Sequence, residues 1–307
     1  MGYAFLLIAC FAGISKLVAM KSSGKVCPGE YNSVRINTFR SIICGLVSVA
    51  IFLFTGAKAE TSGWWIWLIS GLSNALTMFV WILCTQRIGL IFVETFCLIG
   101  STAIPMLIAP LLYDGDTVSV LQWVGVICLL LAVVVLSIKP KNQSKEELSE
   151  NNGKKNKSSV ITIVYILLLI LSNVGLSVSQ KLYPTFVGEG YTAYFNLMTF
   201  AVVLFCFALV LIFGKFIKNK SFLPENTTSG KKLIIFVCVA AVMIYAYQYF
   251  STLAAGMLPS AIFYPLAKGI SMLLTVTCDV LIFKQKITKS VLLGLVFILA
   301  SIVLTNL

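Results

Sequence analysis

The segment from Lys139 to Ser159 has the sequence KPKNQSKEELSENNGKKNKSS and contains almost no apolar side chains. A segment of this composition cannot bury enough apolar surface to fold on its own, so we expect a solvated linker at 139–159. The linker divides the chain into residues 1–138 and 160–307. The apolar segments on its two sides decide the fold.

Five continuous apolar segments precede the linker and five follow it. Each approaches the roughly 20 residues that a helix needs to cross the apolar core of a bilayer. None alternates between apolar and polar residues as the strands of a membrane barrel do. The sequence therefore predicts an all-α integral membrane protein with ten transmembrane helices, at 2–20, 36–56, 63–84, 90–112, 119–138, 160–182, 191–213, 232–254, 259–282 and 289–306.

The overall composition agrees with a membrane location. The chain has 307 residues, of which 59% are hydrophobic and 11% charged, and its mean hydropathy is +0.98. The first apolar segment lacks a basic start and a cleavage site, which indicates a retained helix rather than a signal peptide. The net charge of +12 comes largely from Lys and Arg beside the apolar spans. Topology and anionic lipid headgroups explain them, so no nucleic-acid partner is expected.

Several kinds of chemistry lack their usual sequence patterns. The chain has no His, and its nine Cys form no C-x-x-C pair, so no metal site, cofactor or histidine proton relay is predicted. There is no P-loop, no G-x-S-x-G and no paired Asp motif. No catalytic residue is predicted, and we expect a protein that is not an enzyme.

The two halves resemble each other weakly and in the same order. Because each half contains an odd number of predicted helices, the second half must be inverted in the membrane relative to the first, as in many secondary transporters. The matched pairs are Lys16 with Lys181, Gly89 with Gly256, Phe96 with Phe263, and Gly125 with Gly294.

The second half resembles the closing part of an EamA repeat of the drug/metabolite transporter superfamily. The resemblance rests on Gly256 to Ala261, Tyr264-Pro265-Leu266, Phe283, Lys286, Thr288 and Gly294, and on Arg87-Ile88-Gly89, Pro105 and Gly125 in the first half. It implies ten helices in two repeats, at 1–138 and 160–307, and transport of a small metabolite. A Gly-Glu pair common in that family is replaced here by Gly115-Asp116 and by Lys284-Gln285-Lys286, which leaves the subfamily open.

The distribution of Lys and Arg and the family resemblance predict opposite orientations of the chain in the membrane. The loops after the first, third, fifth, seventh and ninth predicted helices hold eighteen Lys and Arg residues, and the opposite side holds only Lys58 and Lys181. The positive-inside rule then places the linker in the cytoplasm and both termini outside, whereas proteins of the resembled family are usually described with both termini inside. The Lys-rich composition favours a bacterial plasma membrane.

Ionisable side chains inside membrane helices are functional candidates because burying a charge in lipid is costly. Lys268 lies nearest the midplane, where a structural pair between helices is the alternative to solute contact. Asp279 follows it three turns later, near the helix end, where a solvated acid is the alternative. Glu94 could carry a coupling proton or form an interfacial ion pair with Arg87. Lys16 and Lys181 lie near the ends of predicted helices. Each side chain could therefore face a cavity or extend its ammonium group toward the lipid headgroups. If Lys16, Lys181 and Lys268 face one cavity with Glu94, the solute would carry a carboxylate or a phosphate.

Uncharged polar and aromatic residues in the predicted helices form a second set of candidates for solute contact. Polar contacts between helices and aromatic packing are the alternatives. The set is Asn74, Thr77, Trp81, Asn173, Ser177, Gln180, Tyr245, Gln248, Tyr249 and Tyr264.

These patterns favour a secondary transporter that moves a small metabolite, anionic or amphipathic, by alternating access between two halves. Membrane lipid and protons are the other expected partners. The alternative is a membrane-embedded enzyme acting on a lipid-linked substrate, which would need clustered acids or His at one membrane face.

Overall fold

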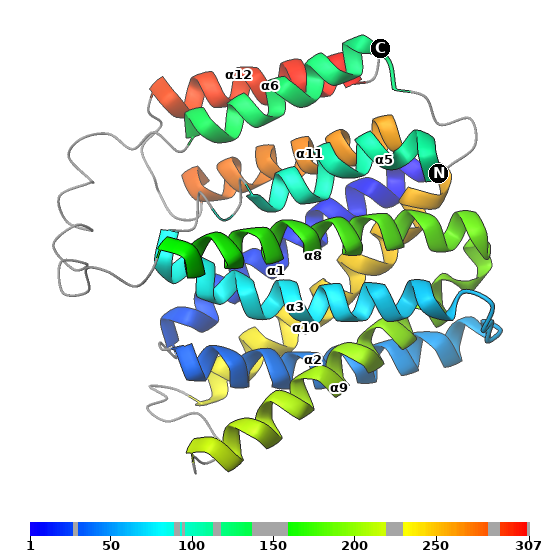
Figure 1. The fold of residues 1–307 in the computed structure, drawn as a ribbon, viewed down its shortest axis with the longest axis vertical. Helices are drawn as coiled ribbons and strands as arrows, with labels where there is room; N and C mark the ends of the chain where they lie inside the picture. The colour runs from blue at the N-terminus through cyan, green and yellow to red at the C-terminus, as the bar shows by residue number, and fades with distance from the viewer. Residues whose placement is uncertain are drawn as a thin grey trace, which may run out of the picture. The chain divides into compact units, whose positions relative to one another are not determined.

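The structure is a computed structural model of the 307-residue chain. It describes residues 1–26, 30–88, 93, 96–112, 118–136, 159–218, 230–281 and 289–305. Within these ranges the chain is helical and contains no strand, which confirms the expected all-α fold (Figure 1). The α-helices are α1 (Gly2–Val26), α2 (Glu30–Thr55), α3 (Trp64–Ile88), α5 (Ile104–Leu112), α6 (Val120–Leu136), α8 (Ser159–Phe186), α9 (Thr192–Lys218), α10 (Gly230–Met257), α11 (Ser260–Leu281) and α12 (Lys289–Thr305).

Several helices extend beyond the apolar ranges expected from the sequence. α1 ends at Val26 rather than at residue 20, and α2 begins at Glu30 rather than at residue 36. Hydropathy marks only the part of a helix that prefers lipid, whereas backbone hydrogen bonding continues through the polar turns beyond it. α2 ends where Gly56 adopts a φ of +59°, a conformation that favours glycine at the end of a helix.

The segment expected as one helix at 90–112 contains an irregular turn. A π-helical turn (η1, Ile99–Ala103) leads directly into α5, and the Ile104 N–H donates to the Ile99 carbonyl oxygen. Pro105, at the second position of α5, has no N–H to continue the hydrogen-bond ladder. Such π-helical turns are rare in proteins, and those that occur are often found at functional sites. Ser101 and Thr102 in this turn are buried.

Large apolar side chains lie at the surface of many helices. Phe54 is 93% exposed and Leu111 83% exposed. Six helices in the described ranges are long and apolar enough to cross a membrane. Water would oppose the exposure of so much apolar surface, whereas lipid favours it. The protein is therefore an integral membrane protein.

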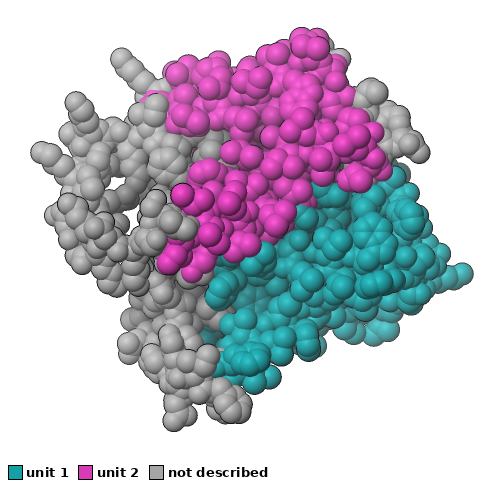
Figure 2. Space-filling model, in the orientation of Figure 1, with its two compact units in different colours: residues 1–82, 175–259 teal, residues 83–174, 260–307 magenta. Residues whose placement is uncertain are grey.

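The chain divides into two compact units, coloured separately in Figure 2. Unit 1 comprises residues 1–82 and 175–259, and unit 2 comprises residues 83–174 and 260–307. Each unit takes residues from both sides of the linker. α8 contributes its first part to unit 2 and its last part, from Gly175, to unit 1.

In unit 1, α10 packs against α1 and α2. α1 and α10 are antiparallel, because Gly2 lies against Leu258 and Gly13 lies against Tyr247. α2 and α10 are parallel: Ile36 and Phe39 pack with Leu233 and Val237, and farther along the Cys44 thiol donates to the Ala241 carbonyl oxygen at 3.3 Å.

α3 packs in unit 1 against α9 and the last part of α8. α3 and α8 are antiparallel, because Gly63 lies against Val187 and Gly175 lies against Ser73. α3 and α9 are parallel, since Ile66 packs with Phe195, Gly71 lies against Val202, and Ala75 packs with Val203.

Unit 2 has a smaller core. Leu98, Leu129, Ala132 and Ile298 form a buried apolar cluster. α6 and α12 lie side by side (Figure 1), and α11 packs against α12. Gly269 of α11 lies close enough to α12 that an added Cβ would be 2.8 Å from Ile302 Cγ1.

Candidate functional site

The predicted candidates fall into both units. Lys268 and Tyr264 lie on α11 in unit 2, where Tyr264 is buried and Lys268 half-buried. Asp279 is in α11, but its side chain lies outside the described part of the structure, as does all of Glu94. The remaining candidate in unit 2 is Asn173; those in unit 1 are Lys16, Asn74, Thr77, Trp81, Ser177, Gln180, Lys181, Tyr245, Gln248 and Tyr249.

Lys181 binds the end of another helix in unit 1. Its Nζ donates a hydrogen bond of 2.5 Å to the carbonyl oxygen of Leu258, just after α10 ends at Met257. The side chain is only 6% exposed. A cation is favourable at a helix carboxyl end because the last carbonyl groups carry partial negative charge. The ammonium therefore has a structural role there.

Lys16 contacts an aromatic ring of α10. Its Nζ lies 4.1 Å from the centroid of the Tyr247 ring, within the range of a favourable cation–π interaction. Gly13, one turn earlier on α1, lies against the same ring. Lys16 and Lys181, matched in the sequence, thus both join a helix to α10, one through a ring and the other through a carbonyl oxygen.

Asn173, in unit 2, forms one hydrogen bond within α8 and one to a neighbouring segment. Its Nδ2 donates to the Leu169 carbonyl oxygen at 2.8 Å and to Cys97 Sγ at 3.6 Å. The second contact joins α8 to the segment that precedes the π-helical turn. Nearby, an added Cβ at Gly100 would lie 2.5 Å from the Ile170 carbonyl oxygen. Asn173 therefore has the partners of a residue that packs two segments together.

Asn74 and Gln248 meet in unit 1, although 174 residues separate them in the sequence. Asn74 Nδ2 donates to Gln248 Oε1 at 3.1 Å, and both side chains are buried. The bond joins α3 to α10. The Gln248 amide nitrogen is buried and has no hydrogen-bond partner within the described chain.

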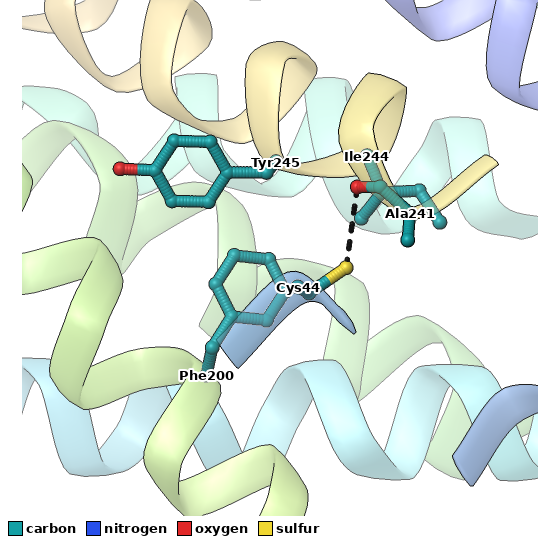
Figure 3. Close-up of a cluster of buried hydrophobic side chains, with 5 residues drawn as sticks. All are labelled: Cys44, Phe200, Ala241, Ile244 and Tyr245. Carbon is teal, nitrogen blue, oxygen red and sulfur yellow. Dashed lines mark hydrogen bonds between the residues drawn. The ribbon is translucent and has the colours of Figure 1, made fainter. Parts of the chain in front are cut away.

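Tyr245 lies one helical turn before Gln248. Its ring stacks on Tyr249 at 5.9 Å and lies 5.9 Å from Phe200 of α9. Figure 3 shows the Tyr245 hydroxyl directed away from the Cys44–Ala241 hydrogen bond. This hydroxyl is buried, and no described residue accepts or donates a hydrogen bond to it.

Further buried polar side chains line α3 and α9 near these residues. Ser70 precedes Gly71, and an added Cβ on Gly71 would lie 2.9 Å from the Thr199 carbonyl oxygen, so the two helices approach closely here. Ser70 Oγ, Thr199 Oγ1 and Asn196 Oδ1 are buried and lack partners among the described residues. We call the whole group the polar layer: Ser70, Asn74, Asn196, Thr199, Tyr245 and Gln248.

An unmet buried polar group costs about 1–3 kcal/mol. Five such atoms lie in the polar layer, on every member except Asn74. Their summed cost would approach the whole stability of an ordinary domain. Buried polar groups without a protein partner are commonly met by ordered water or by a ligand.

Five buried polar or charged residues are not among the candidates predicted from the sequence. Ser70, Asn196 and Thr199 gave no signal that distinguishes them from other polar residues in apolar helices. The predicted helix at 36–56 excludes Arg35 and includes Arg40, and both lie in α2 and are buried, at 0% and 3% exposure. Arg40 was detectable, because it is a charged residue inside the predicted span 36–56.

Comparison with known proteins shows the fold but no family. No protein-family model and no curated protein matches the chain. A solved chain, described as "Crystal structure of protein", matches 99% of this chain over 95% of its own length, with a TM-score of 0.66 and 17% sequence identity. At this identity the likeness shows a shared fold and nothing about activity.

Proposed function

We propose that the protein is a secondary transporter that moves a small metabolite across the membrane by alternating access. The proposal includes ten membrane helices built as two inverted five-helix repeats, and membership of the drug/metabolite transporter superfamily in its EamA-like branch. Transport follows from this plan because inverted repeats provide two alternative arrangements around one site.

The helix pairing within unit 1 is the observation that carries the proposal. If the halves are repeats, α1, α2 and α3 correspond to α8, α9 and α10. The antiparallel pair α1 and α10 then has a counterpart in α8 and α3, which are also antiparallel. The parallel pair α2 and α10 has a counterpart in α9 and α3, which are also parallel. This correspondence supports an inverted repeat.

The charge of the solute is a separate question. The sequence suggested the hypothesis that Lys16, Lys181 and Lys268 bind an anionic solute. Lys181 and Lys16 are engaged with the Leu258 carbonyl oxygen and the Tyr247 ring. These contacts weaken the anion hypothesis, because they give two of the three cations a structural role. Proton coupling through Glu94 or Asp279 remains part of the proposal.

A combined binding and exchange experiment tests the proposal against the enzyme alternative. Purified protein is screened by thermal shift against amino acids, sugars, sugar phosphates, nucleosides and organic cations, because a bound solute raises the melting temperature. Each stabilising solute is then tested for counterflow in liposomes containing the protein. We expect exchange of an unmodified solute. A stabilising compound that is chemically converted in detergent and shows no counterflow would overturn the transporter proposal.

A further inference from the structure

The polar layer of unit 1 is held together by contacts between three helices. The Asn74–Gln248 hydrogen bond joins α3 to α10. The close approach of Gly71 to the Thr199 carbonyl oxygen joins α3 to α9. The contact between the rings of Phe200 and Tyr245 joins α9 to α10. The six residues therefore lie on three helices that contact one another within the unit.

The layer differs from the ordinary hydroxyl groups of these helices. A Thr or Ser in an apolar helix usually donates to the carbonyl oxygen four residues earlier. Thr252 does so to Gln248 at 2.8 Å, and Ser41 does so to Asn37 at 2.8 Å. Thr199 Oγ1 and Ser70 Oγ are equally buried and have no such bond within the described chain. These hydroxyl groups are left available to something other than their own helix.

The available groups define the chemistry of a ligand. Gln248 Nε2 is a donor, Asn196 Oδ1 is an acceptor, and the three hydroxyl groups can act as either. None of the six side chains carries a charge. The six side chains themselves offer a charged ligand no opposite charge in return for its lost hydration. An uncharged ligand with both donors and acceptors matches the groups present.

We propose that the polar layer binds an uncharged, hydrogen-bonding solute, such as a sugar, polyol or neutral amide. This inference rests on the proposed transport function and narrows it, because it makes the transported metabolite neutral. The stacked rings of Tyr245 and Tyr249 supply an apolar surface beside the polar groups. Such a combination suits a solute with one polar edge and one apolar face.

Matched solute pairs test the inference on the full-length protein in detergent. Glucose is compared with glucose 6-phosphate, and nicotinamide with nicotinate, within a wider set of neutral sugars, polyols, nucleosides and amides. We expect at least one neutral solute to raise the melting temperature, and its charged counterpart to do so less. Failure of the whole neutral set, or stabilisation by charged solutes alone, would overturn the inference.

Thr199→Val and Tyr245→Phe remove one hydroxyl each and preserve shape. Without solute, these variants should melt at the wild-type temperature or higher, because an unmet buried group has been removed. Binding of the neutral solute should weaken roughly threefold to tenfold in each. Thr252→Val is the matched control: Thr252 is as buried as Thr199, but its hydroxyl is already bonded within α10. Wild-type affinity in both test variants would overturn the inference.

The outcomes separate this inference from the transport proposal. Counterflow of a charged solute that is unaffected by Thr199→Val and Tyr245→Phe would leave the transporter and remove the neutral site. A neutral solute that depends on the layer for binding but never exchanges across liposomes would leave the site and remove the transporter.

Discussion

Lys181 Nζ lies 2.5 Å from the Leu258 carbonyl oxygen, so a buried cation of α8 closes the carboxyl end of α10. Lys181→Met should lower the free energy of unfolding by about 1–3 kcal/mol, because the carbonyl oxygen loses its donor. Chemical denaturation in detergent measures the change. Lys58→Met, in the exposed loop after α2, is the control and should change stability by less than about 0.5 kcal/mol. Equal effects of the two substitutions would contradict a structural role for Lys181.

The Asn74–Gln248 bond predicts energetic coupling between α3 and α10. A double-mutant cycle with Asn74→Leu and Gln248→Leu should give an interaction energy of about 0.5–1.5 kcal/mol, which is the range of such bonds in membrane proteins. The comparison cycle pairs Asn74→Leu with Thr55→Val, whose exposed hydroxyl bonds within α2. That cycle should be additive. Additivity in both cycles would show that the amide pair contributes no coupling.

Substitution by alanine at two glycines should change the stability of the protein in opposite directions. An added Cβ at Gly71 would lie 2.5 Å from Val202 Cβ and 2.9 Å from the Thr199 carbonyl oxygen, so Gly71→Ala should destabilise by about 1–3 kcal/mol. At Gly45 of α2 the same Cβ meets no atom within 4 Å. Gly45→Ala should therefore stabilise by about 0.5–1 kcal/mol, since glycine is unfavourable inside a helix. Thermal unfolding of both variants measures the difference, and a Gly71→Ala variant as stable as the wild type would contradict the α3–α9 packing.

The Glu60 carboxylate should titrate below its ordinary value of 4.5. The Ser62 backbone N–H donates to Glu60 Oε1 at 3.0 Å, and this bond lowers the pKa by favouring the charged form. Because the folded-state pKa is lowered, the contribution to stability is present above the ordinary pKa and is lost as the pH falls through the folded value. NMR titration of carboxyl-labelled Glu residues, assigned with Glu60→Gln, measures this pKa. A value at or above 4.5 would contradict the contact.

The orientation of the chain can be determined by cysteine labelling. The positive-inside rule predicts that Ser144 of the linker is cytoplasmic and that Lys58 is outside. In a background without native cysteines, Lys58→Cys should react with an impermeant maleimide in intact cells, and Ser144→Cys only after lysis. The reverse pattern would show that both termini lie inside, as is usual in the family that the sequence resembles.

The sequence predicted the helical membrane fold because hydropathy is a local property of each segment. It also selected Asn74, Gln248 and Tyr245 as candidates, since polar residues are uncommon in such segments. It could not predict that Asn74 meets Gln248, because no local pattern encodes contacts across 174 residues. Thr199 and Thr252 look alike in the sequence, and only the structure distinguishes the one with an unmet hydroxyl. Arg35 was misplaced because α2 begins six residues before its apolar part.

Unit 1 combines two chain segments that are synthesised at different times. Its first part ends at residue 82, and its last part is complete only at residue 259. At roughly 5–20 residues per second, a ribosome needs about 10–35 s to synthesise the chain between these points. Ser70 and Asn74 are made before this interval begins, whereas α9 is completed late in it and α10 only at its end. α3 must therefore wait at the insertion machinery or in lipid until Gln248 becomes available to Asn74.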